Sequence, residues 1–322
     1  MRFPLSWEMN MKNYTTLKDI SNLHETIKDA ILLKMNPYEY SEIGKHKTLV
    51  MLFFNSSLRT RLSSEKAAKN LGMDVIILNV NDAWNLEFED GTIMDLDKSE
   101  HIKEAAQVIS QYADLIAVRA FPTLKDKAID ESEFILNSFK KYATVPIINM
   151  ESATAHPLQA LADAITISEL TEKKMPKVVL SWAPHPKALP QAVANSFVEM
   201  MQNLDVDFTI THPEGYELNT EITKDTTINY NQEQALQNAD FVYVKNWSSY
   251  NSYGKILSHD ANWMMTKEKL GKAKFMHCLP VRRNVVVEDS VLDSNQSVVI
   301  QQANNRTFAA QVVLKQLLEN LK

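Results

Sequence analysis

The segment 55–61, with the sequence N-S-S-L-R-T-R, directly follows an apolar run and directly precedes a helical pattern. A helix that starts at the end of a strand exposes unpaired backbone N–H groups, with the positive end of the helix dipole behind them. Ser57 and Thr60 add hydroxyl donors, and the planar guanidinium of Arg59 suits a phosphate. The segment therefore predicts an anion site. The alternative is an ordinary helix N-cap with solvated arginines.

Two further segments carry residues that could act on a carbonyl group. Arg119 ends another apolar run, and His156-Pro157-Leu158-Gln159 opens a helical pattern with Asp163 one turn beyond Gln159. A histidine at this place could donate to a carbonyl oxygen while the glutamine orients an amide. The alternative role for His156 is that of a turn or cap residue.

A third motif, His277-Cys278-Leu279-Pro280, lies in the last third of the chain and precedes Arg282. A lone cysteine such as Cys278 is more often an inert apolar side chain than a nucleophile. The motif alone therefore makes no strong case for covalent catalysis.

Composition excludes several classes of protein. Lys and Arg number 34 against 40 Asp and Glu, a net charge of -6, so there is no general basic field to attract nucleic acid or an anionic membrane. The single cysteine excludes an internal disulfide and a multi-cysteine zinc site, and the 6 glycines form no nucleotide-phosphate loop. No apolar stretch reaches the roughly 18 residues of a membrane span. We expect a cytoplasmic protein, with Met11 as a plausible start and residues 1–10 left out of the fold.

Apolar runs rich in Val, Ile and Phe alternate with helical patterns along the chain. The strand-like runs lie at 48–54, 74–80, 115–121, 145–150, 177–183, 207–212, 241–247 and 275–280, and the helical patterns near 61–72, 100–113, 156–170, 188–203 and 304–321. This order predicts an α/β fold with two doubly wound parallel-sheet domains. We place the domains at 12–150 and 151–303, with the helix 304–321 returning to the first. In such folds ligands bind at the carboxyl ends of strands.

The motifs occur in the order S-x-R-T-R, V-R, H-P-x-Q with L-A-D following, and H-C-L-P. Four motifs in this order resemble the aspartate/ornithine carbamoyltransferase family over about residues 11–322. Within that family, the segments 182–186 (W-A-P-H-P) and 245–247 (K-N-W) and the sequence HCLPVRRN look like the N-acylornithine carbamoyltransferase branch.

This resemblance implies a carbamoyl phosphate site in the first domain, an acylornithine site in the second, and a homotrimer with shared active sites. The residues implied for carbamoyl phosphate are Ser57, Leu58, Arg59, Thr60, Trp84, Arg119, His156, Gln159, Cys278, Leu279 and Arg306. The residues implied for the acylornithine are Glu151, Lys245, Cys278, Arg282 and Ser99. Trp84 falls in the loop that enters a neighbouring subunit's site in relatives; without the resemblance it reads as an exposed loop anchor.

The implied reaction transfers the carbamoyl group of carbamoyl phosphate to the δ-amine of an N-acylornithine, in arginine biosynthesis. Arg59, Thr60, Arg119, His156, Gln159 and Cys278 are the implied catalytic residues, and no metal or organic cofactor is needed. In relatives, a glutamate in the first turn of the helix after D-x-D accompanies acetyl use and a proline accompanies succinyl use. That position falls at Ser99, which is small and uncharged, so we expect N-succinylornithine as the acceptor. The alternatives are N-acetylornithine and a non-catalytic carbamoyl-phosphate-binding protein.

Overall fold

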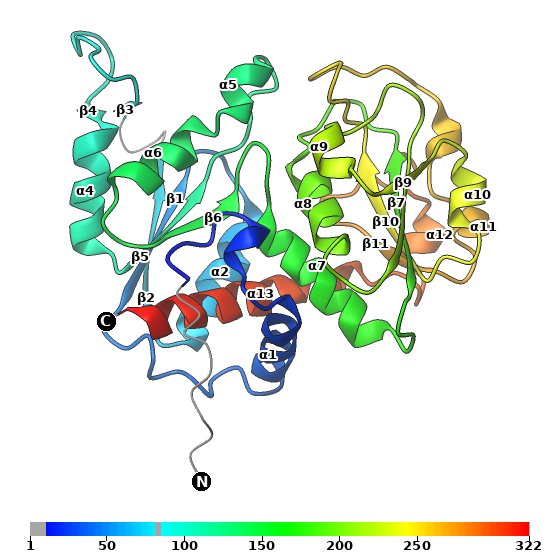
Figure 1. Ribbon diagram of the computed structural model, residues 1–322, viewed down its shortest axis with the longest axis horizontal. Helices are drawn as coiled ribbons and strands as arrows, with labels where there is room; N and C mark the ends of the chain where they lie inside the picture. The colour runs from blue at the N-terminus through cyan, green and yellow to red at the C-terminus, as the bar shows by residue number, and fades with distance from the viewer. Residues whose placement is uncertain (1–10, 81–84, 322) are drawn as a thin grey trace.

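The computed structural model describes residues 11–80 and 85–321, which form two lobes, each built around its own parallel sheet (Figure 1). The first sheet has the order β2-β1-β5-β6, and β3 and β4 form a separate short pair. Its strands are β1 (Thr48–Phe53), β2 (Asp74–Asn79), β5 (Leu115–Arg119) and β6 (Ile147–Glu151), with β3 (Leu86–Glu87) and β4 (Glu100–His101) in the pair. The helices of this lobe are α1 (Leu23–Met35), α2 (Leu58–Asn70), α4 (Ile102–Tyr112), α5 (Lys127–Glu131) and α6 (Phe134–Tyr142), with the 3-10 turn η1 (Leu17–Asp19).

The second sheet has the order β11-β10-β7-β8-β9, again all parallel. Its strands are β7 (Lys177–Ala183), β8 (Asp207–Thr211), β9 (Thr227–Asn229), β10 (Phe241–Asn246) and β11 (Lys274–Met276). Its helices are α8 (Ala192–Met201), α9 (Thr220–Thr223), α10 (Gln232–Leu236), α11 (Lys267–Leu270) and α12 (Asp289–Leu292), with the 3-10 turn η2 (Ala261–Trp263). The central strands of both sheets are buried along nearly their whole length, which is why they read as continuous apolar runs.

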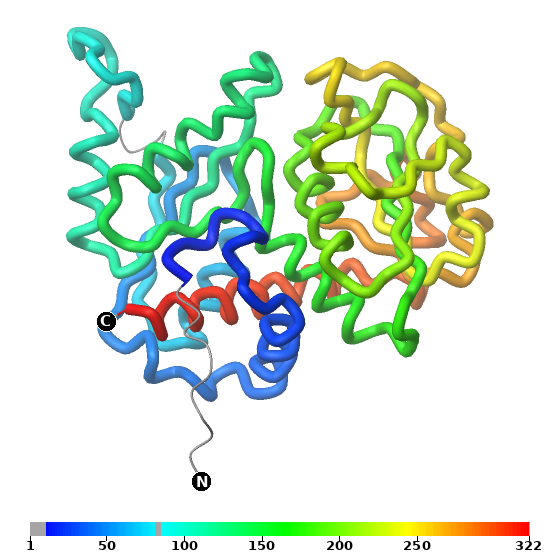
Figure 2. Tube along the Cα trace, in the orientation of Figure 1, coloured from blue at the N-terminus to red at the C-terminus, as the bar shows by residue number. Residues whose placement is uncertain are grey.

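Two long helices join the lobes. Helix α7 (Pro157–Leu170) follows β6 and packs on α8, and helix α13 (Val299–Asn320) packs on α1, α2 and α7. Figure 2 shows the C-terminal segment running from the second lobe back beneath the first. The return of the last helix to the first domain is thus confirmed, although α13 begins at Val299, five residues before the expected position 304.

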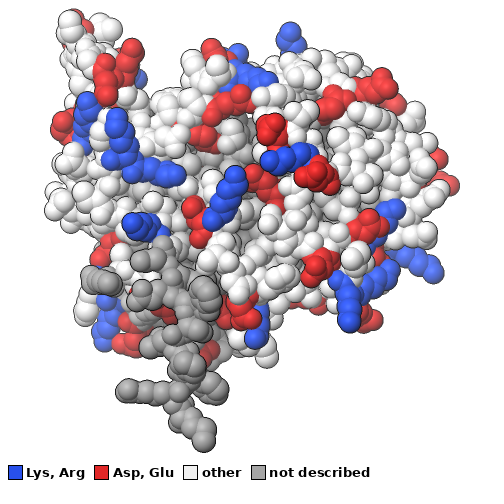
Figure 3. Space-filling model, viewed as in Figure 1, with Lys and Arg blue, Asp and Glu red and all other residues white. Residues whose placement is uncertain are grey.

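The predicted fold class is confirmed, and each of the expected strand-like runs contains a strand. The last strand is shorter than expected: β11 ends at Met276, so the H-C-L-P motif is a loop and not a strand. Helices α1 and α6 and strand β9 were not expected. Within the described residues, no helix is long and apolar enough to cross a membrane. The face drawn in Figure 3 mixes acidic and basic side chains, in keeping with the absence of a general basic field.

Candidate active site

A cavity of about 420 Å³ lies where the carboxyl ends of strands from both sheets meet. Strands β1, β5 and β6 of the first sheet and β10 and β11 of the second end beside it. The predicted residues that line it are Ser57, Arg59, Thr60, Arg119, Glu151, His156, Gln159, Lys245, Cys278, Leu279, Arg282 and Arg306. Residues that are up to 249 positions apart in sequence, from Ser57 to Arg306, thus face one hollow.

The first turn of α2 is open to an anion. Ser57 occupies the N-cap with an extended backbone (φ −154°), its side chain makes no capping hydrogen bond, and the turn contains no acidic residue. The backbone N–H groups of the turn therefore point outward with the helix dipole behind them. The Nε atom of Arg59 is buried and has no hydrogen-bond partner. This end of the cavity suits a phosphate, because its helix amides and the Arg59 Nε have no protein acceptor.

Arg306 on α13 connects the α2 turn to His156. Its Nη2 donates to Thr60 Oγ1 at 2.6 Å and lies 3.4 Å from His156 Nε2. Because a guanidinium can only donate, Nε2 accepts and the proton of the neutral ring lies on Nδ1. His156 Nδ1 is buried without a partner, and His156 lines the cavity. This places a neutral N–H donor where a carbonyl oxygen could bind.

Arg119 forms an ion pair with Glu151 and keeps further N–H donors that have no partner. Its Nη2 lies 3.0 Å from Glu151 Oε2, and its guanidinium stacks over the Phe121 ring at 5.2 Å. Its Nε and Nη1 are buried and have no partner. Glu151, expected at the acylornithine, is therefore already paired with a cation, and its Oε2 lies 3.6 Å from His156 Nε2.

The opposite side of the cavity carries two cations. Lys245 is buried and its Nζ donates to Cys278 Sγ at 3.5 Å. Arg282 Nε donates to His185 Nε2 at 3.2 Å, and His185 Nδ1 contacts the Lys187 carbonyl oxygen at 2.7 Å. Since Lys245 and Arg282 make no ion pair among the described residues, this side suits a carboxylate.

The H-C-L-P loop turns sharply into the cavity. Leu279 has a left-handed backbone (φ 57°), and its N–H donates to His277 Nδ1 at 2.9 Å. A branched side chain rarely adopts this conformation, and such residues are concentrated at functional sites. His277 is buried, and burial together with Lys245 and Arg59 lowers its pKa well below the ordinary value. A neutral His277 with Nδ1 as acceptor therefore carries its proton on Nε2.

Some lining residues were not expected from the sequence. They are Phe121, His185, Leu189, Pro190, Val193, Asn246, His277 and Pro280. Most follow strand ends or adjoin expected residues, so the strand-end rule could have found them. His185 lies within the W-A-P-H-P segment, which was used for the resemblance and not for the site.

Two of the expected residues that the structure describes do not line this cavity. Leu58 is 68% exposed and lies over a neighbouring hollow, although its backbone belongs to the open turn of α2. Ser99 is exposed in a loop, and its expected place in the first turn of a helix is wrong because α4 begins at Ile102 with His101 as its N-cap. Trp84 lies outside the described residues.

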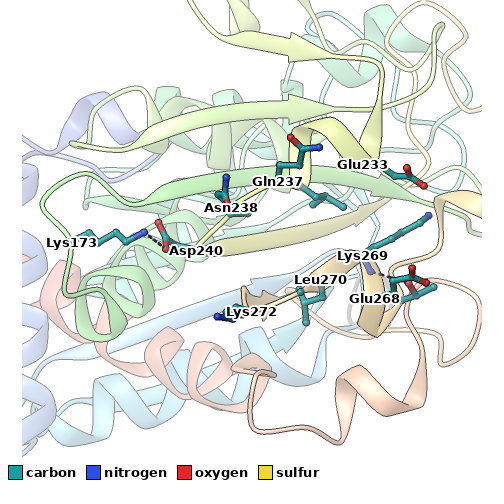
Figure 4. Close-up of a pocket in the computed structure, with 13 residues that line it drawn as sticks. Lys173, Glu233, Gln237, Asn238, Asp240, Glu268, Lys269, Leu270 and Lys272 are labelled. Carbon is teal, nitrogen blue, oxygen red and sulfur yellow. Dashed lines mark hydrogen bonds and ion pairs between the residues drawn. The ribbon is translucent and has the colours of Figure 1, made fainter.

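A larger hollow, of about 850 Å³, lies at the amino ends of β10 and β11 (Figure 4). Its Lys173 and Asp240 are paired at 2.6 Å, and Lys269 Nζ donates to Gln232 Oε1 at 2.8 Å. None of the unpartnered buried polar atoms found in the described residues belongs to its lining. Size alone does not make it a binding site, and the cavity at the strand carboxyl ends is the better candidate.

The neutral state of His156 can be tested by pH. Burial, reinforced by Arg306 and Arg119, lowers the pKa of His156 well below its ordinary value of 6.5. As the pH falls through about 6.5, His156 becomes protonated in the unfolded chain but stays neutral in the folded chain. The free energy of unfolding therefore has its full value above that pH and decreases below it. Between about pH 7.5 and 5.5, we expect the free energy of unfolding to fall less in His156→Gln than in the wild type. The slopes of the two proteins should differ by at most about 1.4 kcal/mol per pH unit.

Urea unfolding at one protein concentration measures this difference. His24→Gln, which removes an exposed histidine of α1, is the matched control and should keep the wild-type slope. Parallel pH profiles for His156→Gln and the wild type would show that His156 titrates normally in the folded protein.

The sequence and the fold both match known proteins. Residues 12–169 match the carbamoyl-P binding domain of aspartate/ornithine carbamoyltransferases, and residues 190–317 match their Asp/Orn binding domain. The chain is 50% identical to an N-succinylornithine carbamoyltransferase of Bacteroides fragilis over 97% of this chain and 100% of the relative. It is 36% identical to an N-acetylornithine carbamoyltransferase of Xylella fastidiosa, over 90% of this chain and 94% of the relative.

A crystal structure of an acetylornithine transcarbamylase complexed with acetylcitrulline is similar in fold, with a TM-score of 0.89 at 34% identity, covering 95% of this chain and 99% of that one. The matching models and the long alignments confirm the family expected from the four motifs. The chain belongs to the aspartate/ornithine carbamoyltransferase family.

Proposed function

We propose that the protein transfers the carbamoyl group of carbamoyl phosphate to the δ-amine of N-succinylornithine, giving N-succinylcitrulline and phosphate, in arginine biosynthesis. The observation that carries this proposal is the cavity in which the open turn of α2, Arg59 Nε and His156 Nδ1 all lack protein partners. Two chains named N-succinylornithine carbamoyltransferase match at 50% identity over 97% of this chain, which supports the choice of acceptor.

The reaction follows from these groups. The phosphate of carbamoyl phosphate binds at the α2 turn with Ser57 and Arg59, and the carbonyl oxygen faces Thr60, Arg119 and His156. These donors stabilise the negative charge that develops when the neutral δ-amine attacks the carbonyl carbon. Phosphate then leaves with its charge held by Arg59 and the helix amides, and one of its oxygens accepts the amine proton. Aligning two substrates in one cavity supplies much of the acceleration.

The acceptor binds toward the second lobe in this proposal. Lys245 and Arg282 receive its carboxylates, and Cys278 lies beside the reacting amine. Three solved relatives support succinyl use: they are variants of an N-acetyl-L-ornithine transcarbamylase in which a glutamate is replaced by alanine, valine or proline, each complexed with carbamyl phosphate and N-succinyl-L-norvaline. Ser99 likewise presents no carboxylate to a succinyl group.

We also propose a homotrimer with shared active sites and keep the domain division at 12–150 and 151–303. On α2, Leu58 and Leu62 are 68% and 58% exposed. Both line a hollow of about 640 Å³ that shares Ser57 with the cavity, with Phe53, Arg61 and Asn79 among its other walls. Exposed leucines four residues apart form an apolar stripe that a second copy of the chain would cover. The loop containing Trp84 and the segment containing Ser99 would then reach a neighbour's cavity.

The acceptor is tested by comparing kcat/KM for ornithine, N-acetylornithine and N-succinylornithine. We expect N-succinylornithine to be preferred, and Ser99→Glu to impair it more than N-acetylornithine because two carboxylates would repel each other. Ser99→Ala, which adds no charge, is the matched control and should keep the preference. A strong preference of the wild type for N-acetylornithine would refute the choice of acceptor. Binding of carbamoyl phosphate without turnover of any acceptor would favour the non-catalytic alternative.

The anion site is tested by Arg59→Ala. Each lost charge-assisted hydrogen bond is worth about 1.5–3 kcal/mol, so carbamoyl phosphate should bind roughly ten- to hundredfold more weakly. Lys69→Ala removes a positive charge from the exposed end of the same helix and should leave the affinity unchanged. Calorimetric titration measures both, and equal affinity for Arg59→Ala and the wild type would place Arg59 outside the site.

The trimer is tested by light scattering. We expect a mass three times that of the 36.7 kDa chain. Leu62→Glu should lower the mass and the activity together, because burying a carboxylate in an apolar contact is costly. Leu32→Glu, which places the same charge at a half-exposed leucine of α1, serves as the surface control. A monomer with full activity would contradict the shared site.

A further inference from the structure

Asp163 on α7 is fully buried, and no ion pair within the described residues includes it. Burial raises its pKa to about 6, although hydrogen bonds from Gln302 and Gln159 act in the opposite direction. Burying an ionisable carboxyl group in this way costs stability, so its presence at this place calls for a reason.

Two glutamine side chains meet at one oxygen of Asp163. Gln159 Nε2 and Gln302 Nε2 each donate to Asp163 Oδ1 at 2.7 Å. In the ionised form of Asp163 this oxygen can only accept, so both amides must turn their NH2 groups toward it. Their carbonyl oxygens must therefore point away from Asp163.

The carbonyl oxygens of the two glutamines differ in their hydrogen-bond partners. Gln302 Oε1 accepts the backbone N–H of His277 at 2.9 Å, which anchors the start of the H-C-L-P loop. Gln159 Oε1 is buried and has no protein partner, and Gln159 lines the cavity. The cavity thus has an unpartnered acceptor at Gln159 and an unpartnered donor at His156 Nδ1.

We propose that Asp163 is a positioning residue that fixes the amide of Gln159 so that its carbonyl oxygen accepts from the NH2 group of carbamoyl phosphate. This inference rests on the proposed function. The oxygen and NH2 ends of a carbamoyl group are similar in size, so shape alone distinguishes them poorly. An acceptor at Gln159 and a donor at His156 distinguish them by hydrogen bonding, and the carbonyl oxygen is thereby directed to the groups that stabilise its charge.

Without the acceptor at Asp163, the Gln159 amide could rotate and present NH2 to the substrate's NH2. The protein would then no longer bind a carbamoyl group more tightly than a group of the same shape that lacks N–H. A loss of packing, in contrast, would weaken both ligands alike.

The test compares two stable probes, phosphonoacetamide and acetonylphosphonate, which differ in an NH2 and a CH3 group beside the same carbonyl and phosphonate. We expect the wild type to bind phosphonoacetamide roughly tenfold or more tightly, because the methyl group leaves Gln159 Oε1 unpaired. Asp163→Leu should bring the two affinities to within about threefold while phosphonate binding persists. Asp163→Asn is the matched control: its Oδ1 still accepts from both glutamines, so the preference should be retained.

Asp163→Ser provides a second variant if Asp163→Leu does not fold, since a hydroxyl can donate as well as accept and so leaves the amide free to turn. An unchanged preference for phosphonoacetamide in Asp163→Leu or Asp163→Ser would overturn the inference. An equal loss of this preference in Asp163→Asn would also overturn it, because the effect would then come from the charge of Asp163. If the wild type binds neither phosphonate and turns over no acceptor, the proposed function itself fails. Turnover by the wild type with an unchanged preference in the variants removes only the role of Asp163.

Discussion

The cavity holds more positive charge than the protein neutralises. Arg59, Arg119, Lys245 and Arg306 line it, and Glu151 is the acidic side chain among its described lining residues, paired with Arg119. Buried cations without partners are costly, and an entering anion removes that cost. The chain as a whole has a net charge of -6, so the attraction for an anion is local to this hollow.

Burial and this charge together set the protonation state of two histidines in the cavity. Burial and nearby cations lower the pKa of both His156 and His277 well below the ordinary value. Each ring is therefore neutral and has one donor and one acceptor. Arg306 occupies the acceptor of His156, and the Leu279 N–H occupies that of His277. The cations thus attract an anionic ligand, and they also add to the effect of burial, which keeps the two imidazoles uncharged.

The helices that join the lobes carry much of this geometry. Gln159 and Asp163 are one turn apart on α7, as Gln302 and Arg306 are on α13, and the two pairs meet where the helices cross. The polar contact continues outward, where Asn305 donates to Thr166 Oγ1 at 2.9 Å and to Glu169 Oε2 at 2.9 Å, and Lys34 binds Glu169. A buried polar network of this kind favours one register of the two helices, because any slip would leave its members unpaired.

The sequence predicts well those structural elements that neighbouring residues determine. The buried strands and the open turn of α2 follow from apolar runs and from residues next to one another in sequence. Helix α1 was missed although Asn22 and Glu25 form an N-cap pattern at its start, and Ile27, Ala30 and Leu33 are buried on one side. Arg306 is different: nothing in its surroundings on α13 marks it, and its contact with Thr60 spans 246 positions. Only the motif order of a family could place it in the site.

The balance of charge also argues for an acylated acceptor. Free ornithine carries an α-ammonium, which needs an anion, whereas the second-lobe side of the cavity presents Lys245 and Arg282, and Glu151 is already paired with Arg119. Acylation removes the ammonium charge, and a succinyl group adds a second carboxylate on the side of the cavity that carries these two cations. The same excess of positive charge that holds the phosphate therefore favours an acceptor with two negative groups over one with a positive group.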